Sequence, residues 1–303
     1  MALDVVTGAF SFTGRHIAER LLEQGRSVRT LTRTPPVPGH PLADRVAWAP
    51  FRFDDSLLES LHGVDTLYNT YWVRFERGDV TFAHAVAITA QLAAAAADAG
   101  VRRIVHVSVA NADASSPLPY YRGKAQNEAL VRHSGLSYAI VRPTVVFGPD
   151  DILVNNVAWG LRHVPVFLVP GSGRYEVQPV SVYDVARIAV EAGARDDDVV
   201  LDVAGQRRWS YEEFVRLIRS AVRGRARIVH APFWAALATA RFAGVLLRDV
   251  LVTRDELESL RDGLLVSHER PLGRDRFDEW LDEHGHELGR TYTSEVRRNF
   301  RRA

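Results

Sequence analysis

The sequence lacks cysteine altogether and contains a single lysine, Lys124, among 38 basic residues. Without cysteine, the chain has no disulfide, no thiolate metal ligand and no thiol nucleophile. The 37 acidic residues nearly balance the basic ones, so the positive bias typical of nucleic-acid-binding proteins is also missing. We therefore expect no metal and no nucleic-acid partner, and chemistry that depends on other side chains.

Long hydrophobic runs are scarce as well. Residues 1–6 include Asp4 and do not resemble a secretory signal, so we expect a cytoplasmic protein. The most apolar segment, 233–250, carries Arg241, Arg248 and Asp249 and is too short and too charged to span a membrane. It predicts a helix that packs in the core or against a second copy of the chain, giving a homodimer. A helix lying at a membrane interface is the alternative.

Residues 3–33 contain a pattern typical of dinucleotide binding. A short apolar strand is followed by a glycine loop, a helix that ends at Gly25, and a second strand at 28–32. This sequence of elements within about thirty residues is the unit that binds a pyrophosphate. Gly8 permits a sharp turn out of the strand. Gly14 lets the helix begin close to the sheet, so that its free N–H groups point at phosphate.

One position of this loop departs from the usual glycine pattern. Ser11 stands where the middle glycine is expected, and its Cβ keeps a ligand further from the backbone than glycine would. The alternative interpretation of the segment is an ordinary tight turn between a strand and a helix. The predicted cofactor contacts in the loop are Thr7, Gly8, Phe10, Ser11, Phe12, Thr13 and Gly14.

The end of the second strand indicates which nucleotide is bound. An acidic residue there would bond the ribose hydroxyl of NAD, whereas an arginine accommodates the 2′-phosphate of NADP. Arg33 stands at this place, and no Asp or Glu occurs between Arg26 and Asp44. The sequence thus favours NADP(H), with NAD(H) as the alternative. Further along, Asp54 could contact the adenine amino group, unless the residues at 55–56 simply cap the next helix.

Strands and helices alternate up to about residue 150. We expect strands at 46–51, 64–68, 102–107 and 137–147, and helices at 57–61, 81–99 and from 120 onward. This alternation predicts an α/β fold, a Rossmann-type doubly wound parallel sheet. Ligands bind beyond the carboxyl ends of such strands, so Asn69, Thr70 and Tyr71 are predicted to face the cofactor or substrate.

The single lysine lies four residues after a tyrosine. Tyr120 and Lys124 therefore project from the same face of a helix. A tyrosine hydroxyl has a pKa of about 10, and a neighbouring ammonium lowers that pKa because it favours the phenolate. In a chain that otherwise uses arginine, the pair predicts acid/base catalysis. The alternative is a chance pair at this common spacing.

Beyond residue 150 the alternation weakens. Residues 180–194 and 199–203 predict a helix and a strand that return to the nucleotide domain. We predict a Rossmann domain of residues 1–149 plus about 176–205, and a smaller, mostly helical substrate lobe of about 150–175 plus 206–303. The aromatic candidates for the substrate pocket favour an apolar or aromatic small molecule; they are Tyr71, Trp72, Trp159 and Phe167.

Together these motifs resemble the extended and atypical short-chain dehydrogenase/reductases. They are further similar to bacterial NAD(P)-binding epimerase/dehydratase-like proteins and to the NADPH-binding accessory subunit of respiratory complex I. Such families contain reductases, epimerases, dehydratases and catalytically silent nucleotide binders. The resemblance rests on the glycine loop, the Tyr120–Lys124 pair, and the segments 69–75, 140–143, 178–180 and 184–186.

By position, the resemblance implies that Tyr120 is the acid/base and that Lys124 is its partner, bonded also to the nicotinamide ribose. The serine that hydrogen-bonds the substrate oxygen is assigned to Ser108, although the usual register of the family falls on Val109 or Ala110. The alternatives for that role are Asn111 and Ser115. Further cofactor contacts are predicted at Pro143 and Val146.

The expected function is an NADP(H)-dependent oxidoreductase of the ketone, aldehyde or enone reductase type. Hydride passes between the nicotinamide and a substrate carbon, and Tyr120 moves the proton. Two alternatives stay open. One is an epimerase or dehydratase that uses the cofactor transiently. The other is a redox-silent protein that holds NADP(H) as a structural or sensing ligand, which the missing register serine favours.

Overall fold

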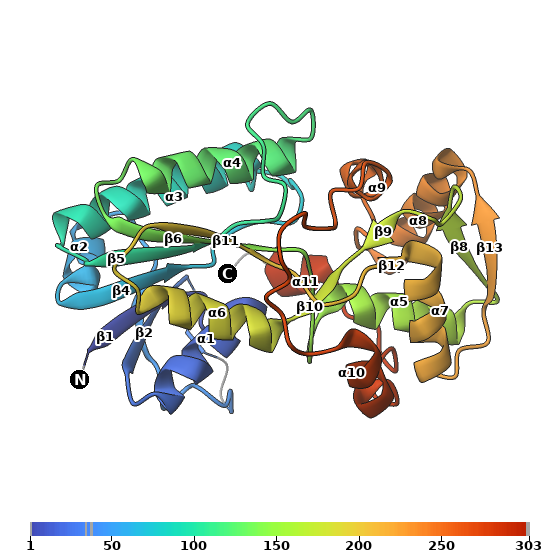
Figure 1. The fold of residues 1–303 in the computed structure, drawn as a ribbon, viewed down its shortest axis with the longest axis horizontal. Helices are drawn as coiled ribbons and strands as arrows, with labels where there is room; N and C mark the ends of the chain where they lie inside the picture. The colour runs from blue at the N-terminus through green and yellow to red at the C-terminus, as the bar shows by residue number, and fades with distance from the viewer. Residues whose placement is uncertain (1, 34, 37–38, 301–303) are drawn as a thin grey trace. The chain divides into compact units, whose positions relative to one another are not determined.

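A computed structural model describes residues 2–33, 35–36 and 39–300, and the chain folds into two compact units (Figure 1). Within the described residues, the first unit holds the chain up to Pro143 together with Val182–Val203. The second unit holds Thr144–Ser181 and the chain from Ala204 onward. The first unit is thus shorter than the expected 1–149 and 176–205, because the segments 145–147 and 179–181 pair with each other.

A parallel sheet of seven strands, counted over the described residues, forms the centre of the first unit. The strand order is β11-β6-β5-β4-β1-β2-β3, and each neighbouring pair is parallel. The order reverses between β1 and β4, which is the switch point at which open sheets bind ligands. The predicted doubly wound α/β fold is confirmed. The strands are β1 (Leu3–Thr7), β2 (Ser27–Thr32), β3 (Ala47–Pro50), β4 (Val64–Asn69), β5 (Arg103–Val107), β6 (Ser137–Pro143) and β11 (Val199–Val203).

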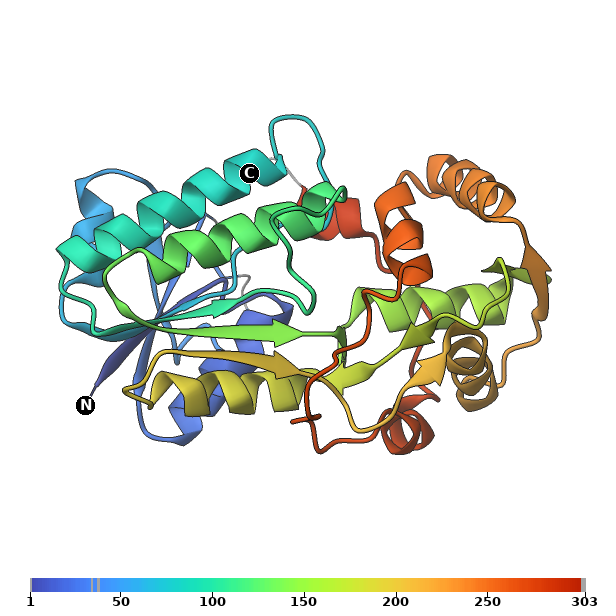
Figure 2. The ribbon, with the colours of Figure 1, turned by 45° about the horizontal axis from the view of Figure 1, so that its top comes forward.

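Helices cover both faces of this sheet (Figure 2). α1 packs against α6 on one face, while α3 packs against α4 on the other. Ile88 and Leu92 of α3 bury their side chains against Leu67, Ile104 and Ile140 of the sheet. Burial on both faces explains the consecutive apolar residues of the middle strands, such as Val5–Val6 in β1 and Ile104–Val105 in β5. The helices are α1 (Phe12–Glu23), α2 (Asp55–Leu61), α3 (Phe82–Asp98), α4 (Pro119–Arg132) and α6 (Val182–Gly193).

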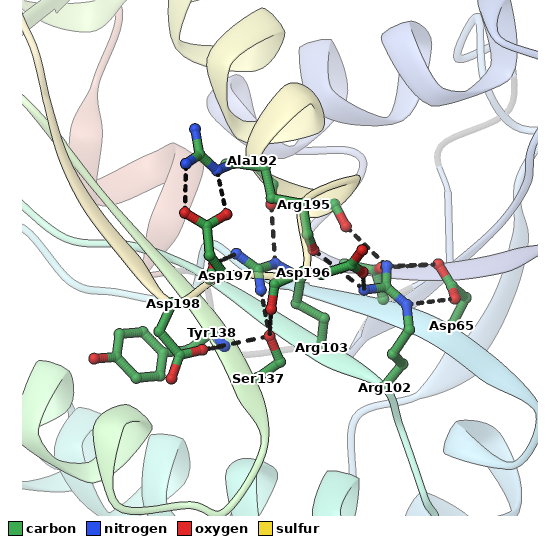
Figure 3. Close-up of polar contacts among 12 residues, drawn as sticks. Asp65, Arg102, Arg103, Ser137, Tyr138, Ala192, Arg195, Asp196, Asp197 and Asp198 are labelled. Atoms are coloured by element: carbon green, nitrogen blue, oxygen red, sulfur yellow. Dashed lines mark hydrogen bonds and ion pairs between the residues drawn. The ribbon is translucent and has the colours of Figure 1, made fainter.

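The returning segment α6–β11 is tied to the sheet by a buried arginine (Figure 3). Arg103 of β5 is fully buried, and its guanidinium donates to the carbonyls of Ala192 (2.9 Å) and Asp197 (2.8 Å) and to the hydroxyl of Ser137. The neighbouring Arg102 donates to the carbonyl of Gly193 at 2.9 Å. These bonds satisfy carbonyls at the C-terminal end of α6 that have no partner within the helix.

The second unit combines helices with short strand pairs. β7 pairs with β10 and β8 with β13, both parallel, while β9 pairs with β12 antiparallel. Its core contains a row of aromatic rings. The ring of Phe277 contacts Phe147 on one side and Phe214 on the other, with ring centres 5.0 Å apart in both contacts. The elements are β7 (Val145–Phe147), α5 (Ile152–His163), β8 (Val166–Pro170), β9 (Glu176–Val177), β10 (Pro179–Ser181), β12 (Trp209–Ser210), α7 (Tyr211–Ala221), β13 (Arg227–Ala231), α8 (Phe233–Leu247), α9 (Arg254–Arg261), α10 (Phe277–His284) and α11 (Glu295–Asn299).

The prediction of a single strand at 137–147 is wrong. The segment forms two strands that belong to different units, β6 in the main sheet and β7 beside β10. Between them, the hydroxyl of Thr144 donates to the carbonyl of Gln178 at 2.5 Å. The apolar run continues through the break because both strands are buried, so composition alone does not reveal it.

Of the two packings expected for residues 233–250, the one in the core is wrong, and the one against a second copy of the chain stays a prediction. The segment forms α8, in which only Ala236 and Gly244 are buried among the described residues. Trp234 and Val245 leave 74% and 76% of their surface exposed. Of the helices that the structure describes, none has the length and apolar character needed to cross a bilayer.

Replacing Arg103 with methionine should destabilise the first unit. The variant removes the buried bond to the carbonyl of Ala192 and the partly buried bond to the carbonyl of Asp197, so we expect a loss of about 1–3 kcal/mol in the free energy of unfolding. Urea denaturation measures this quantity. Arg195→Met is the control, because its ion pair with Asp197 is solvent-exposed and should contribute little. Equal effects of the two substitutions would contradict the anchoring role of Arg103.

Candidate functional site

The glycine loop after β1 brings the start of α1 into contact with the strand. Gly8 has a φ of +69°, a conformation that favours glycine. A Cβ on Gly14 would lie 2.2 Å from the carbonyl oxygen of Gly8, so only glycine fits at this point of the helix. Ser11 donates to that same carbonyl through its N–H (2.8 Å) and its hydroxyl (2.6 Å). The loop therefore has the tight shape that the sequence predicted.

The N-terminus of α1 is open to an anion. Ser11 is the N-cap residue, it is exposed, and its side chain makes no capping hydrogen bond to the helix. The first turn contains no acidic residue. Free N–H groups and the positive end of the helix dipole are thus available to a phosphate. The hydroxyl of Ser11 is bonded to the carbonyl of Gly8, so it does not occupy these N–H groups.

Side-chain hydrogen bonds join β1, β4 and β5 at their carboxyl ends. The hydroxyl of Thr7 accepts the N–H of Thr70 at 2.8 Å, and the hydroxyl of Thr70 donates to the carbonyl of Thr7 at 2.5 Å. The Thr7 hydroxyl also lies 3.3 Å from the amide oxygen of Asn69. The amide nitrogen of Asn69 lies 3.1 Å from Nδ1 of His106 on β5. This chain of contacts fixes the edge at which the glycine loop and the loop after β4 begin.

Tyr120 and Lys124 lie on α4, as their spacing predicted, and an aromatic wall surrounds the tyrosine. The ring of Tyr120 meets Trp72 and Phe82 edge-on, with centres 5.8 and 5.9 Å apart. Trp72 and Phe82 are themselves stacked at 5.6 Å. The aromatic loop after β4 thus reaches the face of α4 that carries Tyr120, within a single unit.

Lys124 is buried, with only 3% of its surface exposed. Its Nζ donates to the carbonyl of Val107 at the end of β5 (3.0 Å) and lies 4.9 Å from the centre of the Trp72 ring. Burial lowers the pKa of Lys124 to about 7, against the opposing effect of the Glu128 carboxylate. Burial, assisted by the charge of Lys124, also lowers the pKa of His106 to about 3, so this imidazole is neutral.

Gly123 makes the approach of Trp72 to α4 possible, a point the sequence interpretation missed. A Cβ at this position would lie 2.8 Å from the indole ring. The signal was available, since a glycine within a helix costs stability and points to a close contact. His106 was assigned only to a strand, and nothing in its immediate sequence indicates that it lies beside the lysine.

Ser108, assigned as the substrate-binding serine, has a different partner in the structure. Its hydroxyl donates to the carboxylate of Glu128 at 2.6 Å, in a buried place. Glu128 is also paired with Arg142, whose Nε lies 2.8 Å away, and with Arg132 at 3.2 Å. Of the alternatives, Ser115 bonds the exposed Asp113, and Asn111 adopts a φ of 60°. Ser108 thus belongs to an ionic cluster beneath Lys124.

The remaining predicted contacts are spread over both units. Arg33 is exposed just after β2, and its charge acts on Tyr71, whose pKa burial nevertheless raises. Asp54 caps α2 by accepting the N–H of Ser56 at 3.0 Å. Pro143 ends β6 and accepts the N–H of Ala110 at 2.9 Å. Val146 lies in β7 of the second unit.

Several buried polar atoms of the first unit have no hydrogen-bond partner among the described residues. They are the hydroxyl of Tyr71, Nε1 of Trp72, Nε2 of His106 and both amide atoms of Asn127. A buried polar atom without a partner is costly, so such atoms indicate a polar ligand or water. Three of them are at or next to the ends of β4 and β5. With the open N-terminus of α1, the residues present fit a dinucleotide with its pyrophosphate on the glycine loop.

A comparison with known protein families identifies the family of this chain. A family described as NAD(P)H-binding matches residues 8–196, which is more than half of the chain. The chain belongs to this NAD(P)H-binding family. The match begins at Gly8 and includes the Tyr120–Lys124 pair. The family resemblance that the sequence indicated is therefore confirmed.

Relatives of this NAD(P)H-binding protein have diverse names. Over 86% of the chain and 70% of the relative, it is 26% identical to the mitochondrial NADH dehydrogenase (ubiquinone) 1 alpha subcomplex subunit 9 of Arabidopsis thaliana. Over 89% of the chain and 88% of the relative, it is 27% identical to a 4-hydroxy-2-methyl-3-oxo-4-farnesyl-3,4-dihydroquinoline-1-oxide ketoreductase of Stigmatella aurantiaca. The relatives thus include both a subunit of a respiratory complex and an enzyme named as a ketoreductase.

Solved structures share the fold. Triphenylmethane reductase of Citrobacter sp. superimposes with a TM-score of 0.76, covering 95% of the chain and 100% of the reductase at 17% identity. The Bordetella bronchiseptica enzyme WbmH, solved with NAD+, gives a TM-score of 0.62 over 77% of the chain and 88% of WbmH at 20% identity. At these identities the likeness establishes the Rossmann fold and leaves the substrate open.

Lys124 should titrate at about pH 7 in the nucleotide-free protein. As the only lysine, it gives a single signal when the protein is labelled with 13C-lysine, and its Cε chemical shift can be followed against pH. The folded pKa lies below the unfolded value of 10.5, so the unfolded state binds more protons between these values and stability rises with pH across that window. A midpoint at pH 10 would contradict the burial of the ammonium.

Proposed function

We propose that this NAD(P)H-binding protein is an NADP(H)-dependent reductase of a carbonyl or enone group on a small apolar or aromatic molecule. The observation that carries the proposal is the buried Lys124 ammonium, held at the end of β5 on the same face of α4 as Tyr120. A buried amine with a lowered pKa at the ligand-binding edge of a sheet is typical of a functional site. The protein otherwise uses arginine for its positive charge.

A nicotinamide dinucleotide held on the glycine loop at Gly8 and Gly14 would supply the hydride to the substrate carbon. With a carbonyl substrate, Tyr120 donates its hydroxyl proton to the substrate oxygen, which becomes the alcohol; with an enone, the same proton goes to the enolate oxygen, and the enol rearranges to the saturated ketone. The charged Lys124 stabilises the tyrosinate that remains, and solvent returns the proton. The rings of Trp72 and Phe82 take the place of water on one side of the tyrosine ring, which strengthens the interaction between ammonium and phenolate.

The ionic cluster under Lys124 supports its position. Glu128 lies one helical turn after the lysine and is held by Arg142 and by the hydroxyl of Ser108. Its carboxylate favours the charged form of Lys124, which burial opposes. We therefore assign Ser108 a positioning role through Glu128, in place of direct contact with the substrate.

The preference for NADP(H) rests on Arg33. It is exposed at the end of β2, where the adenosine ribose of a dinucleotide lies in this fold. Neither Asp nor Glu occurs among the residues that immediately follow the strand. The guanidinium can pair with a 2′-phosphate through two parallel hydrogen bonds.

A redox-silent NADP(H) binder is the second candidate. The observation that favours it is the engagement of Ser108 with Glu128, together with the lack of a hydroxyl at Val109 and Ala110. The relatives named as subunits of NADH dehydrogenase are compatible with it. This candidate shares the nucleotide site and differs in having no substrate.

Arg33→Ser should reverse the nucleotide preference. Loss of a charge-assisted contact to the 2′-phosphate should weaken NADPH binding about 10- to 100-fold and leave NADH binding unchanged. Fluorescence or calorimetric titration of nucleotide-free protein measures both constants. Arg20→Ser, at an exposed arginine of α1, is the matched control. Tighter binding of NADH than of NADPH by the unmodified protein would refute the assignment.

Tyr120→Phe should abolish turnover and spare nucleotide binding. Removing the proton donor lowers general acid catalysis about 10²- to 10⁴-fold, while the ring that packs on Trp72 and Phe82 is retained. The assay follows nicotinamide absorbance with a panel of apolar ketones, aldehydes and enones. The control is Tyr121→Phe, the neighbouring tyrosine. Tight NADPH binding with no oxidation by any substrate would favour the silent binder, and unchanged turnover would remove Tyr120 from the mechanism.

A further inference from the structure

α8 of the second unit carries the most exposed large apolar side chains of the described protein. Trp234, Phe242, Val245 and Leu246 are 74, 69, 76 and 70% exposed. No other large apolar side chain that the structure describes exceeds 48%. Isolated exposed apolar residues are ordinary, but a cluster on one element indicates an interaction surface.

These side chains form one continuous face of the helix. At about 100° per residue, Trp234, Ala238 and Val245 lie along one row, and Phe242 and Leu246 lie on the side next to it. The two buried residues, Ala236 and Gly244, lie on the opposite side. α8 packs there against β8 and α9 (Figure 1). The arc of this exposed apolar face is wider than the narrow seam of a coiled coil.

The charges on this surface are of one sign. Between residues 232 and 248 the chain has no Asp or Glu, and its charged residues are Arg241 and Arg248. Arg241 follows Trp234 by seven residues, so it lies along one edge of the apolar row, and Arg248 is the residue at which the helix ends. Neither arginine forms an ion pair with a residue that the structure describes, and both are exposed.

These features fit a lipid surface better than a second copy of the chain. Two α8 faces in contact would bring arginines together with no carboxylate on either helix to neutralise them. Four side chains on one helix also offer less than the roughly 800 Å² per partner that a stable protein interface buries. An anionic bilayer offers acyl chains for the apolar row and phosphates for the arginines.

We propose that α8 binds the surface of membranes that contain anionic phospholipids. The helix lies in the plane of the interface, with Trp234, Phe242, Val245 and Leu246 at the acyl boundary and with Arg241 and Arg248 among the phosphates. Its 15 residues give a length of about 22 Å, shorter than the hydrocarbon core of about 30 Å, so it binds on the bilayer and does not cross it. The proposal does not depend on the nucleotide site.

Vesicle flotation tests the proposal with the full chain. We expect the protein to float with vesicles of phosphatidylcholine containing 30% phosphatidylglycerol, and to bind pure phosphatidylcholine and high-salt samples much less. Phe242→Ser combined with Val245→Ser should weaken binding about tenfold or more. The matched control, Leu58→Ser with Leu153→Ser, removes two exposed leucines outside α8 and should bind normally.

The electrostatic part of the proposal is tested separately. Arg241→Gln should weaken binding to anionic vesicles about fivefold, whereas Arg216→Gln, outside α8, should not.

The absence of cysteine allows a second, site-specific readout. The variant Ala238→Cys, labelled at its single thiol with an environment-sensitive nitrobenzoxadiazole dye, should give a blue-shifted emission on anionic vesicles. The same dye at Leu58→Cys should not respond. Failure to bind vesicles, or equal binding by the α8 variant and its control, would overturn the proposal. A dimer that Phe242→Ser with Val245→Ser converts to monomer, without vesicle binding, would assign the face to a second copy instead.

Discussion

The hydrogen bonds between Thr7 and Thr70 hold the ends of β1 and β4 together at the point where the strand order reverses. Because helices leave these two strands on opposite faces of the sheet, the loops beyond them diverge and open a crevice. The bonds also satisfy backbone groups that have no further strand partner. They thereby fix the start of the glycine loop and of the aromatic loop that carries Trp72. The positions of the α1 N-terminus and of Trp72 follow from this contact.

The site combines a charge with the conditions that oppose it. Burial of Lys124 disfavours its ammonium, while the carboxylate of Glu128, the carbonyl of Val107 and the face of the Trp72 ring favour it. The balance leaves the pKa close to neutrality. A fully solvated lysine would stay charged, and a buried lysine without these partners would stay neutral. Arg142 and Ser108 hold the carboxylate of Glu128 in place, and this carboxylate in turn raises the pKa of Lys124.

Local patterns predicted most of the first unit, and long-range contacts account for what they missed. The strand alternation, the glycine loop and the spacing of Tyr120 and Lys124 are periodic features that the sequence displays directly. The bond from Ser108 to Glu128 joins residues twenty positions apart, and no periodicity indicates it. The break at Thr144 lies within an apolar run, because both strands are buried. α8 is apolar on all sides, so its sequence could not indicate which face lies in solvent.

The single lysine also makes the protein unusual toward amine-directed reagents. Acylating and reductively alkylating compounds normally modify many surface lysines, but this chain offers them one side-chain amine, and the guanidinium groups do not compete. With a pKa of about 7, a large fraction of that amine is uncharged and nucleophilic in neutral solution. Its burial restricts access to reagents that can enter beside Trp72. The extent of Lys124 modification therefore reports how often the packing around its Nζ opens, without any substrate being known.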